Sequence, residues 1–131
     1  MLKFEGIVTS GLGKAGTFIK KDTYQKQYQN KLGFKPFAGT LNVKLKSNVE
    51  INLKEKYIDN LKIIKGNDKL GDVYFLKAKI SNNELTKNGA ILFPTKTVHK
   101  MDTIEFVAEE KLRETMKLKD KSKVKVTIII D

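Results

Sequence analysis

Two short oxygen-bearing side chains on one face of an expected strand are the residues best suited to chemistry in this sequence. Thr40 and Asn42 stand two positions apart in a run of alternating hydrophobic and polar residues, so their side chains share a face and lie roughly 7 Å apart along the strand. Both are neutral oxygen donors, and Mg²⁺ is usually held by one or two protein ligands plus substrate phosphates. The pair therefore suits a nucleotide-bound metal, and an ordinary strand with a hydrogen-bonding Thr and Asn also explains it.

A glycine-rich segment near the N-terminus is the second candidate site. Residues 11–16 match the pattern G-x-G-x-x-G, but a dinucleotide-binding turn also needs a helix that opens at the glycines and an acid about 20 positions later. Thr17–Ile19 has an extended character, and no acid occurs between Asp22 and Glu50, so that class is excluded. What remains is either a loop whose backbone N–H groups approach phosphates or a plain connection between extended segments.

The charge of the chain favours an anionic partner. Its 131 residues include 26 Lys and Arg against 15 Asp and Glu, a formal net charge of +11, which suits nucleic acid, nucleotides or phosphorylated small molecules. Arg113 is the only arginine, and this disfavours nucleic acid, because proteins that read base edges depend on the bidentate fork of Arg. Arg113 is either kept for bidentate contact with a phosphate or carboxylate, or is one more cation on a helix face.

Other catalytic groups are few. His99 is the only histidine, and in a polar loop a surface or structural role is commoner than general-base catalysis. Glu105 lies between Ile104 and Phe106 in an alternating segment, so its carboxylate faces either a site or solvent. The absence of Cys excludes disulfides, zinc-thiolate sites and thiol nucleophiles.

Short strands must position these residues. Alternation predicts strands at residues 2–9, 40–45, 73–80, 89–93, 103–108 and 124–130. The spacing of Tyr24, Tyr28 and Leu32 predicts a helix that begins at Asp22 or Thr23 and ends at Gly33, with the tyrosines in the core. Glu109 and Glu110 suit the start of a second short helix that runs through Met116. This order has no regular βαβ alternation and predicts a small β-barrel or a sheet-rich α+β domain spanning residues 1–131.

Composition indicates the broad class of protein. Hydrophobic residues make up 40% of the chain and charged residues 31%, which is typical of a soluble globular domain. No apolar run reaches the length of a membrane span, and the N-terminus does not resemble a signal peptide. We therefore expect a cytoplasmic protein with no membrane partner.

An ordered set of motifs resembles that of the archaeal CTP-dependent riboflavin kinases over nearly the whole chain. The set comprises Ser10–Gly13, Leu32–Phe34 with Gly39–Asn42, Gly89–Ile91 with Pro94 and Thr97–His99, and Lys111–Glu114. No single block is diagnostic, whereas the order and spacing together are. The resemblance implies a mainly β fold, a small six-stranded cradle-loop (RIFT-like) β-barrel with two short helices. It also implies transfer of the γ-phosphate of CTP to the 5′-hydroxyl of riboflavin, giving FMN and CDP.

The resemblance further implies roles for particular residues. The nucleotide loop falls on Gly11, Leu12, Gly13, Lys14, Ala15 and Gly16, and a second nucleotide-binding segment on Lys111, Leu112, Arg113 and Glu114. The ligands of Mg²⁺ fall on Thr40 and Asn42, and the flavin contacts on Thr97 and Glu105. The resemblance assigns no proton acceptor; Glu105 is the one acid that we propose for this catalytic role. The expected partners are small molecules, riboflavin and CTP as substrates and FMN and CDP as products, with no nucleic acid and a monomeric protein.

The chain departs from the family pattern in two places. Ala15–Thr17 replaces a stretch expected to be bulkier or more charged, and Lys121-Ser122 stands where barrels of this kind often have Gly-Asp. The second departure leaves the conformation of the final turn open. Two other functions stay open as well: a basic nucleic-acid-binding β-barrel, and a barrel that binds nucleotide or flavin without turnover.

Overall fold

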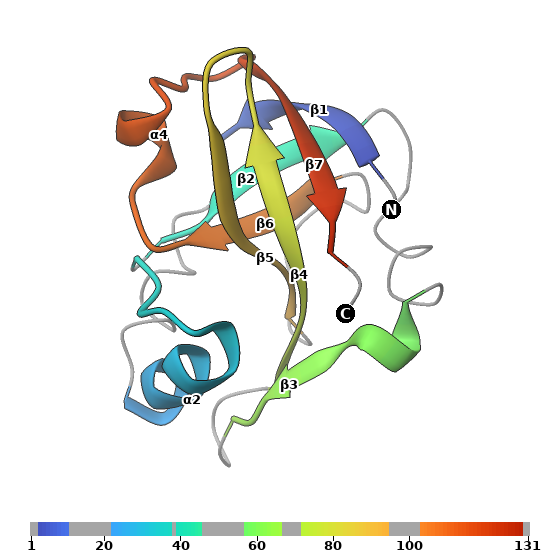
Figure 1. Cartoon of the computed structure of the whole chain (residues 1–131), viewed down its shortest axis with the longest axis vertical. Helices are drawn as coiled ribbons and strands as arrows, with labels where there is room; N and C mark the ends of the chain where they lie inside the picture. The colour runs from blue at the N-terminus through green and yellow to red at the C-terminus, as the bar shows by residue number, and fades with distance from the viewer. Residues whose placement is uncertain are drawn as a thin grey trace.

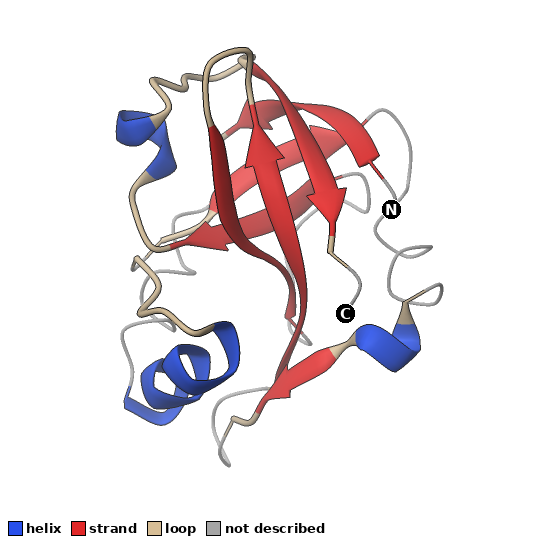
Figure 2. Ribbon diagram, in the orientation of Figure 1, coloured by secondary structure: helices blue, strands red, loops and turns tan. Residues whose placement is uncertain are grey.

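A computed structural model of the chain describes residues 3–10, 22–37, 39–45, 57–66, 72–94 and 103–129. Strands predominate among these residues, with two short helices and one 3₁₀ turn (Figure 2). In chain order the elements are β1 (Lys3–Thr9), α2 (Asp22–Leu32), β2 (Leu41–Leu45), η1 (Ile58–Asn60), β3 (Lys62–Ile64), β4 (Val73–Ser81), β5 (Thr86–Pro94), β6 (Thr103–Ala108), α4 (Leu112–Thr115) and β7 (Lys123–Ile128). None of the helices in the described part of the chain is long and apolar enough to cross a membrane.

Six strands close into an antiparallel barrel. They are hydrogen-bonded in the order β4-β5-β6-β2-β1-β7, and pairing of β7 with β4 closes the ring. One edge of β4 pairs with two strands: Ala78–Ser81 pairs with β7, and Val73–Phe75 pairs with β3. Figure 1 shows β3 leaving the closed part of the barrel at the lower end of the molecule, near α2. The barrel with two short helices confirms the expected fold class.

The barrel interior holds the larger hydrophobic cluster. The alternating residues of β2 and β6 point into it, as their sequence pattern predicted: Leu41, Val43, Leu45, Ile104, Phe106 and Ala108. Residues of β1, β4, β5, β7 and the segment around α4 complete this core. The opposite faces of β2 and β6 are therefore the ones that can carry polar residues without breaking the core.

Helix α2 covers the outer face of the sheet. Its Tyr24 and Tyr28 are each 2% exposed and pack with Ile64, Phe75, Ala90, Leu92 and Val107, which confirms the predicted helix and the core role of the tyrosines. The helix ends at Gly33, whose φ of 84° suits glycine and whose N–H donates to the carbonyl of Gln29 at 3.0 Å. The Gln27 side chain also pairs with the backbone of Lys65 just after β3, through two hydrogen bonds of 2.7 Å.

Some predicted boundaries were wrong. The second helix is a single turn, Leu112–Thr115, and begins three residues after Glu109 because Lys111 is still extended, with φ −74° and ψ 99°. Strand β5 begins at Thr86 instead of Gly89, because the Asn82 side chain accepts hydrogen bonds from two turn N–H groups and allows pairing to start directly after that turn. In the final turn Lys121 adopts a φ of 75°, the left-handed conformation that favours glycine.

Candidate active site

Asn42 and Glu105 face each other across β2 and β6, on the side turned away from the barrel interior. The strand register pairs these two residues directly, which places their Cβ atoms about 4.5–5.5 Å apart in an antiparallel sheet. Thr40 stands just before β2 and donates a hydrogen bond of 3.1 Å from Oγ1 to Oε1 of Glu105, across 65 sequence positions. Strand pairing thus assembles the two predicted metal ligands and the predicted carboxylate into one cluster, called here the oxygen cluster.

The oxygen cluster is largely shielded from solvent. Asn42 is 9% exposed and Glu105 is 5% exposed. The phenol of Tyr28 lies close enough to interact. Burial raises the pKa of Tyr28 above the ordinary value, and repulsion between its phenolate and both the Tyr24 phenolate formed at high pH and the Glu105 carboxylate raises it further. Because water screens charges poorly at such a place, a cation bound beside these oxygens would interact with them more strongly than on an open surface.

The donor atoms of the oxygen cluster fit a hard cation. Oδ1 of Asn42 is buried without a hydrogen-bond partner among the described residues, and such a group costs about 1–3 kcal/mol when left unpaired. Thr40 uses its hydroxyl hydrogen on Glu105 and keeps oxygen lone pairs for another partner. Amide, hydroxyl and carboxylate oxygens are the donors that Mg²⁺ prefers. The described residues hold no group of three acidic, His or Cys side chains suited to a metal, so ligand oxygens would have to complete the coordination.

A pocket opens beside the oxygen cluster, between the segment that leads into β2 and the segment that joins β6 to α4. Its volume is about 210 Å³, and it is lined by Phe37, Gly39, Thr40, Leu41, Phe106, Ala108, Glu110, Lys111, Leu112 and Arg113. The N–H of Phe37 donates to the carbonyl of Ala108 at 2.8 Å, which holds the two segments together. Thr40 belongs to both the oxygen cluster and the pocket wall.

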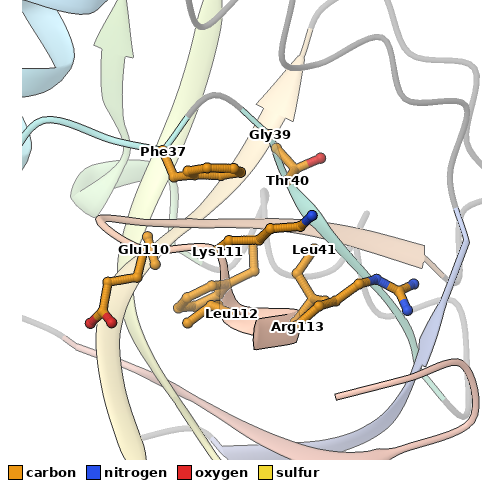
Figure 3. A pocket seen from close by; sticks show the side chains of 10 residues that line it. Phe37, Gly39, Thr40, Leu41, Glu110, Lys111, Leu112 and Arg113 are labelled. Carbon is orange, nitrogen blue, oxygen red and sulfur yellow. The ribbon is translucent and has the colours of Figure 1, made fainter. Parts of the chain in front are cut away.

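Positive charge gathers on the Thr40 side of this pocket. Figure 3 shows the ammonium of Lys111 pointing toward Thr40 and the guanidinium of Arg113 extending to the right, whereas the carboxylate of Glu110 lies at the left, away from both. Glu110 is also paired, 3.1 Å from Nζ of Lys87 and 2.9 Å from the hydroxyl of Thr115. These hydrogen bonds, first that with Lys87, lower the pKa of Glu110. The carboxylate of Glu110 is therefore bound to Lys87 and Thr115. The side of the pocket near Thr40 carries the cations and suits a polyphosphate.

Arg113 links the pocket to the end of β1. Its Nη2 donates to Oδ1 of Asp120 at 2.7 Å and to the carbonyl of Thr9 at 3.3 Å. Oδ2 of the same Asp120 accepts a 2.7 Å hydrogen bond from Ser10. The hydrogen bonds with Ser10 and then Arg113 lower the pKa of Asp120. The single arginine of the chain is thus fixed against the residues that directly precede the glycine-rich segment.

Comparison with known proteins agrees with this geometry. The family model of the CTP-dependent riboflavin kinase domain, described as "Domain of unknown function DUF120", matches residues 8–128. The chain belongs to this family. It is 55% identical to a riboflavin kinase of Methanosphaera stadtmanae over 130 residues, 98% of each chain. It is 38% identical to a riboflavin kinase of Methanobrevibacter smithii over 125 residues, which cover 95% of this chain and 98% of that relative.

The structure brings together most of the described residues to which the riboflavin kinase resemblance assigned roles. Thr40, Asn42 and Glu105 form the oxygen cluster, and the second nucleotide segment reaches the pocket with Lys111, Leu112 and Arg113. Glu114 does not line the pocket; it is exposed and lies 3.6 Å from Nζ of Lys111. The predictions for Gly11, Leu12, Gly13, Lys14, Ala15, Gly16, Thr97 and His99 lie outside the described residues.

Sequence reasoning missed two residues in or beside the site, Phe37 and Asp120. Phe37 lines the pocket and is 40% exposed. Its sequence context, an aromatic residue in a Pro- and Gly-containing turn before β2, does not show whether the side chain enters the core or a pocket. Asp120 had no sequence signal either. Its partners Ser10 and Arg113 stand in separate parts of the sequence, and only the docking of the final turn brings them together.

Proposed function

We propose that the protein is a CTP-dependent riboflavin kinase that transfers the γ-phosphate of CTP to the 5′-hydroxyl of riboflavin, giving FMN and CDP. The observation that carries this proposal is the place of Thr40, which joins the buried oxygen cluster to the cationic side of the pocket. A metal-anchoring pair beside phosphate-binding cations is what phosphoryl transfer requires. The name of the family model supports CTP as donor, and the names of the matched relatives support riboflavin as acceptor.

The phosphates would be bound from several elements. Thr40 and Asn42 would hold Mg²⁺, which when bound neutralises phosphate charge. Lys111 contributes a point charge and Arg113 a planar fork of N–H donors, both from the wall of the pocket. The family resemblance assigns a nucleotide loop to residues 11–16, and we propose that their N–H groups and Lys14 would bind the phosphates, in the way that consecutive N–H groups bind anions.

The acceptor would be oriented on the other side of the cluster. Glu105 would contact the flavin, together with Thr97, to which the family resemblance assigns the same role. Thr40 holds one oxygen of the Glu105 carboxylate in place through the 3.1 Å hydrogen bond. Of the residues proposed for the site, Glu105 is the base best placed to accept the proton of the attacking hydroxyl. Its burial limits access of water to the reacting groups and so disfavours hydrolysis of the nucleotide.

The test is a direct assay with four donors. Purified protein is incubated with riboflavin, Mg²⁺ and one of CTP, ATP, UTP or GTP, and FMN is separated from riboflavin by chromatography. FMN should form chiefly with CTP. Protein that unfolds cooperatively and yet forms no FMN with any donor would reject the kinase, and equal rates with ATP and CTP would reject the donor alone.

The proposal includes only small-molecule partners and a monomeric enzyme of 14.9 kDa. The excess of Lys over Arg supports this, because it suits general solubility better than groove recognition. Light scattering of the active protein should give the monomer mass. Tight binding to RNA or DNA that falls steeply with salt would support the nucleic-acid function instead.

A further inference from the structure

The turn between α4 and β7 is docked on the end of β1. The N–H of Lys121 donates to the carbonyl of Val8 at 2.7 Å, and the N–H of Val8 donates to the carbonyl of Ser122 at 2.8 Å. These reciprocal backbone bonds fix the turn against the last residues of β1. Asp120, which immediately precedes Lys121, is therefore held beside Thr9 and Ser10 by the backbone itself.

The two carboxylate oxygens of Asp120 serve two different elements. Oδ2 accepts from the hydroxyl of Ser10, the residue directly before Gly11, and Oδ1 accepts from Nη2 of Arg113 in α4. Both distances are 2.7 Å, which is the usual length of an O–H···O bond for Ser10 and the short, charge-assisted length of an N–H···O bond for Arg113. One side chain outside the pocket thus connects a pocket-lining cation to Ser10, the residue that follows β1.

This arrangement fixes one edge of the Arg113 guanidinium. Nη2 donates to both Asp120 and the carbonyl of Thr9, whereas Nη1 and Nε have no hydrogen-bond partner among the described residues. Because the guanidinium is planar and rigid, holding one edge sets the direction in which the remaining N–H groups point. Arg113 lines the pocket, so its other N–H groups are available to a ligand there without further ordering of a long side chain.

We propose that Asp120 is a positioning residue for the nucleotide phosphates, orienting Arg113 through one oxygen and holding Ser10, which follows β1, through the other. This inference rests on the proposed function, because it takes the pocket beside Thr40 as the phosphate site. Asp120 itself touches no substrate.

The exposure of these groups separates a positioning role from a structural one. The side chains of Arg113 and Asp120 are 35% and 55% exposed, and exposed ion pairs contribute little to stability. Loss of Asp120 should therefore leave the thermal midpoint within a few degrees of wild type. Nucleotide affinity should fall, because Arg113 would then have to be ordered during binding.

The experiment measures the dissociation constant of CDP with Mg²⁺ by calorimetry, together with the steady-state kinetics of FMN formation. Asp120→Ala should weaken CDP binding at least tenfold and raise the KM for CTP similarly, with kcat and the KM for riboflavin nearly unchanged. Asp120→Asn and Ser10→Ala should each give a smaller loss. Asp59→Ala is the matched control, since Asp59 is an exposed aspartate in η1 at the other end of the molecule from α4 (Figure 1), and it should bind CDP as wild type does.

A double variant tests the route of the effect. In an Arg113→Ala background, Asp120→Ala should weaken CDP binding no more than Ser10→Ala does, because the path through Arg113 is already lost. Additive losses would contradict the route through Arg113. If Asp120→Ala does not fold, as shown by the absence of cooperative unfolding, the CDP affinities of Asp120→Asn and Ser10→Ala are used in its place. Wild-type affinity in both variants would contradict the inference.

The outcomes distinguish this inference from the proposed function. Wild-type protein that forms FMN while the Asp120 and Ser10 variants keep wild-type CDP affinity would overturn the inference alone. Wild-type protein that forms no FMN but binds CDP in an Asp120-dependent way would overturn the proposed function and support the inference. A wild-type protein that neither forms FMN nor binds CDP would overturn both.

Discussion

Replacing Asn42 by Val should change stability and activity in opposite directions. Oδ1 of Asn42 is buried without a hydrogen-bond partner among the described residues, and an unpaired buried polar group costs about 1–3 kcal/mol. Val removes that oxygen and suits a strand. In the absence of metal and nucleotide we expect Asn42→Val to raise the free energy of unfolding by about 1 kcal/mol, which raises the thermal midpoint by roughly 3–5 °C for a domain of this size.

The same substitution should damage the enzyme. If Asn42 anchors the metal, kcat/KM for FMN formation falls at least tenfold, and each tenfold corresponds to about 1.4 kcal/mol of transition-state stabilisation. Stability is measured by urea denaturation and by heating, and activity by chromatography of FMN. Lys44→Val is the control, because Lys44 stands two positions further along the same face of β2 and is exposed, so neither property should change much.

Each half of this reasoning can fail separately. A variant that is less stable than wild type by more than about 1 kcal/mol would show that Oδ1 is well paired in the native protein. A value of kcat/KM within twofold of wild type would remove Asn42 from the metal site. Both results together would show that Asn42 and Glu105, which are paired across β2 and β6, have a structural role in the sheet and do not form a metal site.

Three further predictions concern the fold that holds the site. A Cβ on Gly89 would lie 2.1 Å from a backbone carbonyl oxygen of β6, so Gly89→Ala should lower the free energy of unfolding by about 2–3 kcal/mol, and an unchanged urea midpoint would contradict this close packing. Lys121 has a φ of 75°, so Lys121→Gly should raise the urea midpoint by relieving about 1 kcal/mol of backbone strain; a lower midpoint would show that the turn is unstrained. The hydrogen bonds from Ser10 and then Arg113 lower the pKa of Asp120 in the folded state. The folded protein therefore binds fewer protons there, and the stabilisation is present above the unfolded pKa of about 3.9 and is lost as pH falls through the folded value. Between pH 5 and pH 2.5, Asp120→Asn should lose less stability than wild type, and equal losses by urea titration would refute this.

Local pattern was enough to predict most elements. Alternation in β2 and β6 predicted which residues enter the barrel, and the four-residue spacing of Tyr24 and Tyr28 predicted a helix with a buried face, because periodicity directly reflects which side of an element is apolar. The predicted start of the second helix at Glu109 was wrong, because the helix begins at Leu112. Acidic residues suit a helix N-terminus but do not determine which residue is the first.

By itself the sequence determined the fold class, the family resemblance and the candidate residues, since residue type and spacing are properties of the chain alone. Tertiary structure decided which candidates meet. The pairing of Asn42 with Glu105 depends on strand register, and the bond of Thr40 to Glu105 spans 65 positions. Asp120 reaches Ser10 and Arg113 only because the final turn docks on β1. Contacts between distant segments arise from barrel closure and strand pairing, and neither leaves a mark in the local pattern of residues.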